Sequence, residues 1–127
     1  MILSQGIETR EGEFFPLCGV FPFRTRMTSH CKLAYAEVTV LRDHLCFPKG
    51  ETARGHAFHF SEIVGETGGG FCYDVKTSRS GFQEGFLSGR VFASYLHLHF
   101  GSNPHFAECL VEQCRESKSH PSPSTSF

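Results

Sequence analysis

Apolar residues in the first hundred positions form short runs and alternations that are typical of β-strands. Leu17–Phe23 is an apolar run bounded by prolines, Lys32–Leu41 alternates between apolar and polar side chains, and Gly55–Val64 does so less regularly. Period-two alternation places apolar side chains on one face of a strand, so each segment predicts one strand. The N-terminal half of the chain is therefore expected to form a sheet.

Glycine and serine divide the next part of the chain into shorter pieces. The cluster 68–70 precedes the apolar segment Phe71–Thr77, and residues 81–100 are interrupted by glycine or serine at several points. Such interruptions mark turns and bulges. We expect a hairpin that leads into a final strand, which gives about six strands in all.

The C-terminal segment has helical periodicity instead. Ser102 or Asn103 can cap a helix, and Pro104 suits the first turn. Apolar residues then recur at helical spacing, at Phe106, Ala107, Leu110, Val111 and Cys114. From residue 117 to 127 the chain is mostly serine and proline, which predicts a disordered tail after a single domain that spans residues 1–116.

Composition narrows the function. The 127 residues, 39% of them hydrophobic, suffice for one modest core. A formal net charge of −1 provides no basic field, so no nucleic-acid partner is expected. No apolar run approaches the roughly 20 residues of a membrane helix, and residues 1–15 do not resemble a signal peptide. We expect no membrane association and a cytoplasmic location.

Six cysteines are present, at positions 18, 31, 46, 72, 109 and 114. They contain no C-x-x-C pair, which disfavours a cysteine-based zinc site. In a reducing compartment they are expected to be thiols that serve as small buried hydrophobes.

Residues 93–104, "ASYLHLHFGSNP", place two histidines one residue apart. On a strand, Tyr95, His97 and His99 would share one face, while leucines occupy the other. This surface lies where a strand ends before a helix, a frequent position for ligand crevices in α/β sheets. Polar fillers bonded to the backbone are the more common role of such a pair.

A metal site is a further alternative. His97 and His99 could be joined by one of His56 and His59, which point to opposite faces of an extended strand. Three imidazoles suit zinc or iron. The nearest carboxylate after His99 is Glu108, on the predicted helix, so no metal ligand set is assigned.

Three segments resemble the C-terminal part of the cobyrinic acid a,c-diamide synthase family. They are "LCGVFPFRTRMTSHCKLAYAEV" at 17–38, "RGHAFHFS" at 54–61 and the histidine segment at 93–104. They occur in the family's order across roughly residues 1–112. Members of this family end in a triad-type (class I) glutamine amidotransferase domain.

The resemblance implies an α/β fold, here the C-terminal portion of a flavodoxin-like amidotransferase domain that is strand-rich with one C-terminal helix. Such domains have a mostly parallel sheet with helices on both faces. Because only one helix is predicted, one face should lack cover and expose apolar residues. We therefore expect the isolated chain to fold poorly and to aggregate.

The resemblance also implies the chemistry. In the family a cysteine thiolate attacks the carboxamide of glutamine, and the released ammonia amidates a corrinoid carboxylate that a separate N-terminal, ATP-binding synthetase domain has activated. His97 takes the place of the triad histidine, and His99 stands where many amidotransferases carry an orienting carboxylate. Arg54, His56 and His59 are supporting residues. ATP and Mg²⁺ are implied only for the full-length enzyme, not for this chain.

Two departures from the family pattern bear on activity. Ala57 replaces a glutamate of the family's "RGHEFHYS", and no cysteine here lies in the family's Cys-Gly-Gly elbow. Cys18 precedes a single glycine, in what is predicted to be a strand interior. Because "MILSQGIE" resembles the residues that follow the elbow, the chain is expected to begin inside its own domain and to be inactive alone. A non-catalytic remnant or interaction module and, less favoured, a small histidine-site metal-binding protein are the alternatives.

Overall fold

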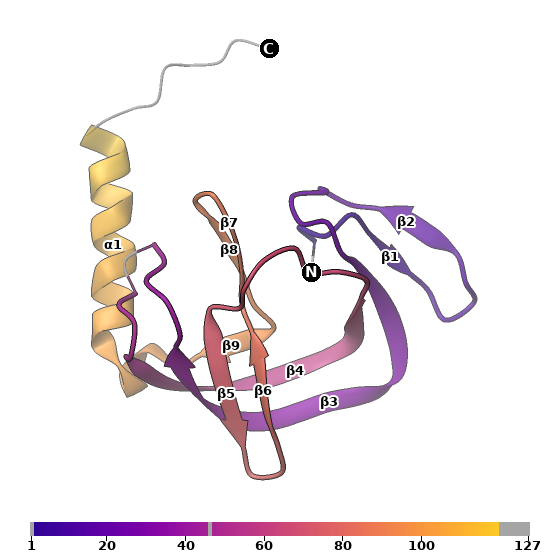
Figure 1. Ribbon diagram of the computed structural model, residues 1–127, viewed down its shortest axis with the longest axis horizontal. Coiled ribbons are helices and arrows are strands. Elements are labelled where there is room, and N and C mark those ends of the chain that lie inside the picture. The colour runs from indigo at the N-terminus through magenta and orange to yellow at the C-terminus, as the bar shows by residue number, and fades with distance from the viewer. Residues whose placement is uncertain (1, 46, 120–127) are drawn as a thin grey trace.

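The computed structural model describes residues 2–45 and 47–119. In this part of the chain a seven-stranded sheet and a separate hairpin precede the helix (Figure 1). The elements are β1 (Gly6–Glu8), β2 (Phe14–Pro16), β3 (Arg24–Val40), β4 (Thr52–Val64), β5 (Tyr73–Thr77), β6 (Gly81–Glu84), β7 (Phe86–Ser88), β8 (Val91–Ala93), β9 (Leu96–Leu98), the 3₁₀ turn η1 (Phe100–Ser102) and α1 (Pro104–Ser119). The chain is strand-rich with one α-helix, as predicted.

The long strands β3 and β4 lie at the centre of the sheet. They pair antiparallel along nearly their whole length, with a register shift between Met27 and Lys32 that lets the ribbon bend. The strand order is β2-β1-β3-β4-β9, and β5 pairs with β3 and with β6. Only β1 and β3 pair in parallel among the described strands. The sheet is thus mixed, and the expectation of a mostly parallel sheet is wrong for this chain.

The core lies on one face of the β3–β4 ribbon. Val38, Val40 and Ala53 are buried there against Tyr73 and Val75 of β5. Side chains alternate along a strand, so residues at the intervening positions lie on the opposite face, which we call the outer face. Leu33, Tyr35 and Phe58 lie on the outer face and are exposed.

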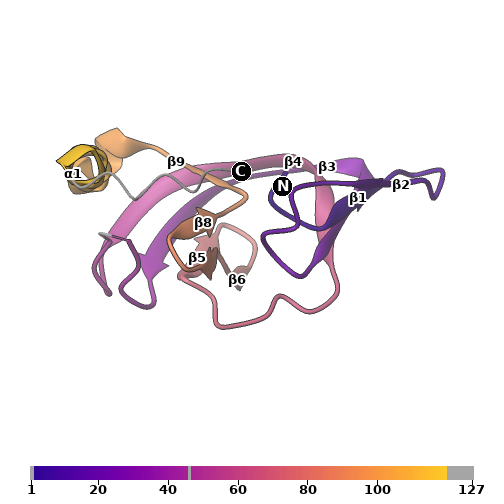
Figure 2. The same cartoon turned by 90° about the horizontal axis from the view of Figure 1, so that it is seen from above.

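Figure 2 shows that β5, β6 and β8 lie beneath the curved β3–β4 ribbon, with the helix at one end. Within residues 2–45 and 47–119, no element covers the outer face. This agrees with the expectation that one face would lack cover. No helix in the described ranges is long and apolar enough to cross a membrane.

The segment Leu17–Phe23 is not a strand, contrary to its apolar pattern. Gly19 has a φ of 68°, which breaks an extended run, and Pro22 lacks a backbone donor for a ladder. The segment is instead a loop along residues 2–5, with the Phe21 amide donating to the Leu3 carbonyl. Phe21 and Phe23 pack with Phe86 in a second core cluster.

The helix begins where the sequence predicts. The side-chain oxygen of Asn103 accepts a hydrogen bond from the His105 amide at 3.2 Å, so Asn103 is the cap. The helix ends at Ser119 rather than before Ser117, so the first three residues assigned to the disordered tail are helical. The rest of that predicted tail, residues 120–127, lies outside the described residues.

Candidate active site

His97 lies in the middle of β9, which pairs antiparallel with β4 so that His97 is directly opposite His56. The two rings stack with centroids 5.0 Å apart and planes 13° from parallel. Gly55 makes this pairing possible, because a Cβ at this position would collide with the carbonyl oxygen of His97. His97 is exposed on the outer face, and His56 is half-buried beside it.

Arg54 and His99 flank this histidine pair. The His99 amide donates to the Arg54 carbonyl at 2.8 Å, and the Arg54 amide donates to Ser102 Oγ at 2.8 Å. These bonds fasten the end of β9 to β4. The His99 ring lies over Gly101, where a Cβ would touch it. The Arg54 side chain is exposed and lies 3.7 Å from the Glu37 carboxylate.

His59 belongs to a different environment. It lies on the core face of β4, opposite to His56, as the alternation predicts. Its ring stacks on Tyr95 at 3.9 Å, and its Nδ1–H donates to the Ser61 carbonyl at 2.7 Å. Burial lowers the pKa of His59, so its neutral form is favoured. The structure therefore separates His59 from the other predicted site residues.

Tyr95 also corrects the sequence analysis, which placed it on one face with His97. Tyr95 precedes β9 and is not part of the strand, so strict alternation does not reach it. Its hydroxyl is hydrogen-bonded to Ser61 Oγ at 2.7 Å, on the same side as His59. Burial raises the pKa of Tyr95, so the phenol stays protonated.

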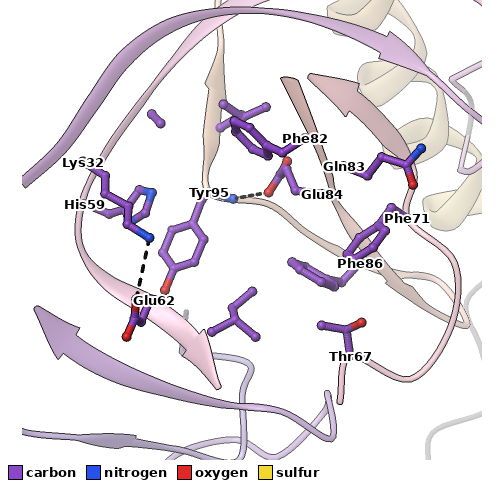
Figure 3. A pocket seen from close by; sticks show the side chains of 13 residues that line it. Lys32, His59, Glu62, Thr67, Phe71, Phe82, Gln83, Glu84, Phe86 and Tyr95 are labelled. Carbon is purple, nitrogen blue, oxygen red and sulfur yellow. Dashed lines mark hydrogen bonds and ion pairs between the residues drawn. The ribbon is translucent and has the colours of Figure 1, made fainter. Parts of the chain in front are cut away.

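His59 and Tyr95 line a cavity of about 360 Å³ beneath the sheet (Figure 3). Its walls are mostly apolar, with Glu84 and Tyr95 at one side and an ion pair between Lys32 and Glu62. Glu84 is buried, and its carboxylate accepts hydrogen bonds from Ser94 Oγ and from the Tyr95 amide at 3.0 Å. Burial raises the pKa of Glu84.

Glu84 and Ser94 are residues that the sequence analysis did not identify. Together they fix the two residues immediately before β9, so the carboxylate helps to set where the strand carrying His97 begins. The only signal in the sequence is a single acid inside the apolar segment "GFQEGF". That signal does not show which backbone amide the acid would bind.

The cysteines are distributed differently from the prediction. Cys72 is buried and its sulfur accepts a hydrogen bond from Arg42 Nε at 3.4 Å, but Cys18, Cys31 and Cys114 are exposed. Cys18 lies in the loop before β3 and not at a strand-to-helix turn. Within residues 2–45 and 47–119, no hydrogen bond joins a thiol to His97. Cys46 lies outside the described residues.

Metal binding gains no support from the geometry. The described residues contain no group of three or more His, Cys, Asp or Glu side chains that could hold a metal ion. The arrangement on the outer face is that of an exposed imidazole held in place by its strand, able to accept and return a proton.

Known proteins of one family are similar to this chain. Residues 1–105 match the CobB/CobQ-like glutamine amidotransferase domain. The cobyrinate a,c-diamide synthase of Syntrophotalea carbinolica is 43% identical over 121 residues, which cover 91% of this chain and 26% of that protein. The corresponding enzyme of Thermoplasma acidophilum is 37% identical over 87% of this chain and 25% of its own length.

Another relative is the hydrogenobyrinate a,c-diamide synthase of Streptomyces coelicolor, 32% identical over 85% of this chain and 22% of that protein. The chain thus spans about a quarter of the length of these relatives and corresponds to their C-terminal part. The family match covers most of the chain, including both histidine segments. The chain therefore belongs to the CobB/CobQ-like glutamine amidotransferase family.

Proposed function

We propose that this chain is the C-terminal part of the amidotransferase domain of a corrinoid a,c-diamide synthase, with His97 as its proton-transfer residue. The observation that carries the proposal is the position of His97, exposed on the outer face and fixed by the pairing of β9 with β4. Because His97 is exposed there, a nucleophile can reach its imidazole from that side. The family relatives, whose names specify cobyrinate or hydrogenobyrinate, support a corrinoid substrate.

In the proposed reaction, a cysteine supplied by polypeptide outside this sequence loses its proton to His97 and attacks the carboxamide carbon of glutamine. His97 then donates that proton to the departing nitrogen, which leaves as ammonia. Water hydrolyses the thioester to glutamate and regenerates the thiol. The ammonia amidates a corrinoid carboxylate that ATP has activated in an N-terminal synthetase domain, where ATP and Mg²⁺ would bind. A cytoplasmic location would keep the thiol reduced.

His56 and His99 receive supporting roles in this proposal. The ring of His56 stacks on that of His97 and limits its rotation, since both lie on paired residues of neighbouring strands. The backbone of His99 fastens the end of β9 to Arg54. Arg54 and Glu37 form an exposed ion pair next to these rings, which places charge at the border of the site. His59 lies on the other face and is given no part in proton transfer.

The test is a chimera in which this chain replaces the matching C-terminal segment of the Syntrophotalea carbinolica enzyme. Glutamate release and corrinoid amidation are measured with glutamine and, separately, with ammonium as the nitrogen source. His97→Ala should lower glutamine-dependent turnover by about a hundredfold or more and leave ammonium-dependent amidation intact. His30→Ala, at an exposed position on β3, is the control and should not change either rate.

A second candidate is a non-catalytic interaction module. It is favoured by the apolar outer face, which would dock onto other polypeptide whether or not catalysis followed. A chimera that assembles and uses ammonium but releases no glutamate from glutamine would favour this candidate. Full glutamine-dependent activity in His97→Ala would overturn the proposed role of His97.

A further inference from the structure

Three polar side chains near the start of α1, separate from the His97 site, are linked by short contacts: Cys109, His105 and Glu51. Cys109 Sγ is 3.2 Å from Nε2 of His105, and Nδ1 of the same ring is 2.7 Å from Glu51 Oε1. The other oxygen of Glu51 accepts a hydrogen bond from Asn103 Nδ2 at 3.1 Å. The thiol of Cys109 thus contacts the imidazole of His105, which in turn contacts the carboxylate of Glu51.

The fold fixes this order. His105 and Cys109 are four residues apart on α1, so their side chains meet on one face of the helix. Glu51 immediately precedes β4, and Asn103 ties the helix start to that point by donating to the Thr52 carbonyl at 3.0 Å. The buried ring of Phe106, stacked on Phe47, holds the helix against the sheet.

The hydrogen bond to Glu51 selects the tautomer of the neutral His105 ring. In the neutral ring, Nδ1–H donates to Glu51, which leaves the lone pair of Nε2 directed at the sulfur of Cys109. His105 can therefore take the thiol proton, and the carboxylate can stabilise the imidazolium that results. This is the arrangement of nucleophile, base and orienting group found in activated thiols.

We propose that Cys109 is an activated thiol that exchanges with low-molecular-weight disulfides. The thiol proton moves to His105 Nε2, and the Cys109 sulfur attacks one sulfur of the disulfide. The old S–S bond breaks, a mixed disulfide forms at Cys109, and the second sulfur leaves as a thiolate that the proton can neutralise. Cys109 is oxidised and the leaving sulfur is reduced, so electrons balance.

Two observations favour exchange over other thiol chemistry. Acyl transfer needs free donors for an oxyanion, but the amides of His105 and Phe106 already donate to Asn103. Metal binding needs a convergent ligand set, which the described residues do not provide. Access is available, since His105 and Cys109 both line an open groove of about 610 Å³ along the helix. The proposal does not depend on the role of His97.

The test compares two cysteines of one helix. The whole chain is treated with limiting dipyridyl disulfide, a neutral reagent that the acids near the groove do not repel. The products are then cleaved by a glutamyl endopeptidase. Cleavage after Glu108 and Glu112 puts Cys109 and Cys114 on different peptides, whose modification is followed by mass spectrometry.

Cys109 should react roughly tenfold or more faster than Cys114, although Cys114 is the more exposed thiol. His105→Gln keeps a donor towards Glu51 but cannot take the proton, so it should abolish the difference. Glu51→Gln should reduce it, and Leu110→Ala, on the same helix but outside the groove, should leave it unchanged. In urea the two thiols should react at similar rates.

The wild-type comparison needs no variant to fold. A native ratio of one or less would overturn the proposal. An equally high ratio in His105→Gln would also overturn it, because the rate would then come from exposure or local flexibility and not from the imidazole.

Discussion

The uncovered outer face should make the isolated chain associate with itself. Tyr35, Phe58 and Phe60 are 86%, 54% and 45% exposed. With about 200 Å² for each aromatic side chain, they leave about 370 Å² of aromatic surface in water. At about 25 cal/mol per Å², covering that surface would contribute about 9 kcal/mol before the costs of association. A patch of this size is comparable to the largest apolar patch of a typical monomer, which is often an interaction site.

The perturbation is the triple substitution Tyr35→Thr, Phe58→Thr and Phe60→Thr, because threonine keeps the strand preference while removing apolar area. Sedimentation velocity over a range of concentrations should show association of the wild-type chain at micromolar concentration and a monomeric triple variant. The control is Phe14→Thr with Phe15→Thr, which removes two exposed rings from β2. A monomeric wild-type chain, or an equal effect of the control, would refute the reasoning.

Three further outcomes follow from the buried contacts. Burial raises the pKa of Glu84 in the folded state, so the wild-type free energy of unfolding should fall as pH rises above about 4.5, and Glu84→Gln should lessen that fall in urea titrations between pH 4 and 8. Phe106→Ala should cost about 3–5 kcal/mol in the same urea assay, while Val111→Ala, at an exposed site, should change it by less than about 0.5 kcal/mol. Asn103→Ala should cost about 1 kcal/mol and lower the helical circular dichroism signal, because the cap of α1 is lost.

The strands were predictable where alternation and turn residues agreed. Thr52–Val64 and Tyr73–Thr77 match the predicted segments closely, and the β7–β8 hairpin leads into β9 as expected. Leu17–Phe23 failed because apolar content alone does not distinguish a strand from a loop that buries its phenylalanines. Strand direction also could not be read from the pattern, since both parallel and antiparallel partners accept the same alternating side chains.

The candidate site was predictable only in part, because alternation places side chains correctly inside a regular strand and not beyond its ends. Alternation correctly put His56 and His59 on opposite faces of β4, because both lie well inside a regular strand. It misplaced Tyr95, which lies just outside β9 and bends towards Ser61. The hydrogen bond from Ser94 to Glu84 joins residues ten positions apart. Such a bond depends on how the hairpins fold back and not on the local sequence.

The position of Ala57 shows which face of β4 a side chain there occupies. Ala57 is buried on the core face of β4, paired with Leu96 and lining the same cavity as His59 and Glu84. A side chain at this position points away from the outer face, where His56 and His97 stack. A glutamate at position 57, as the family resemblance implies, would therefore face the inner cavity next to Glu84 and would need its own partners there. The imidazole of His97 keeps its setting, since its position depends on Gly55 and the pairing of β9 with β4.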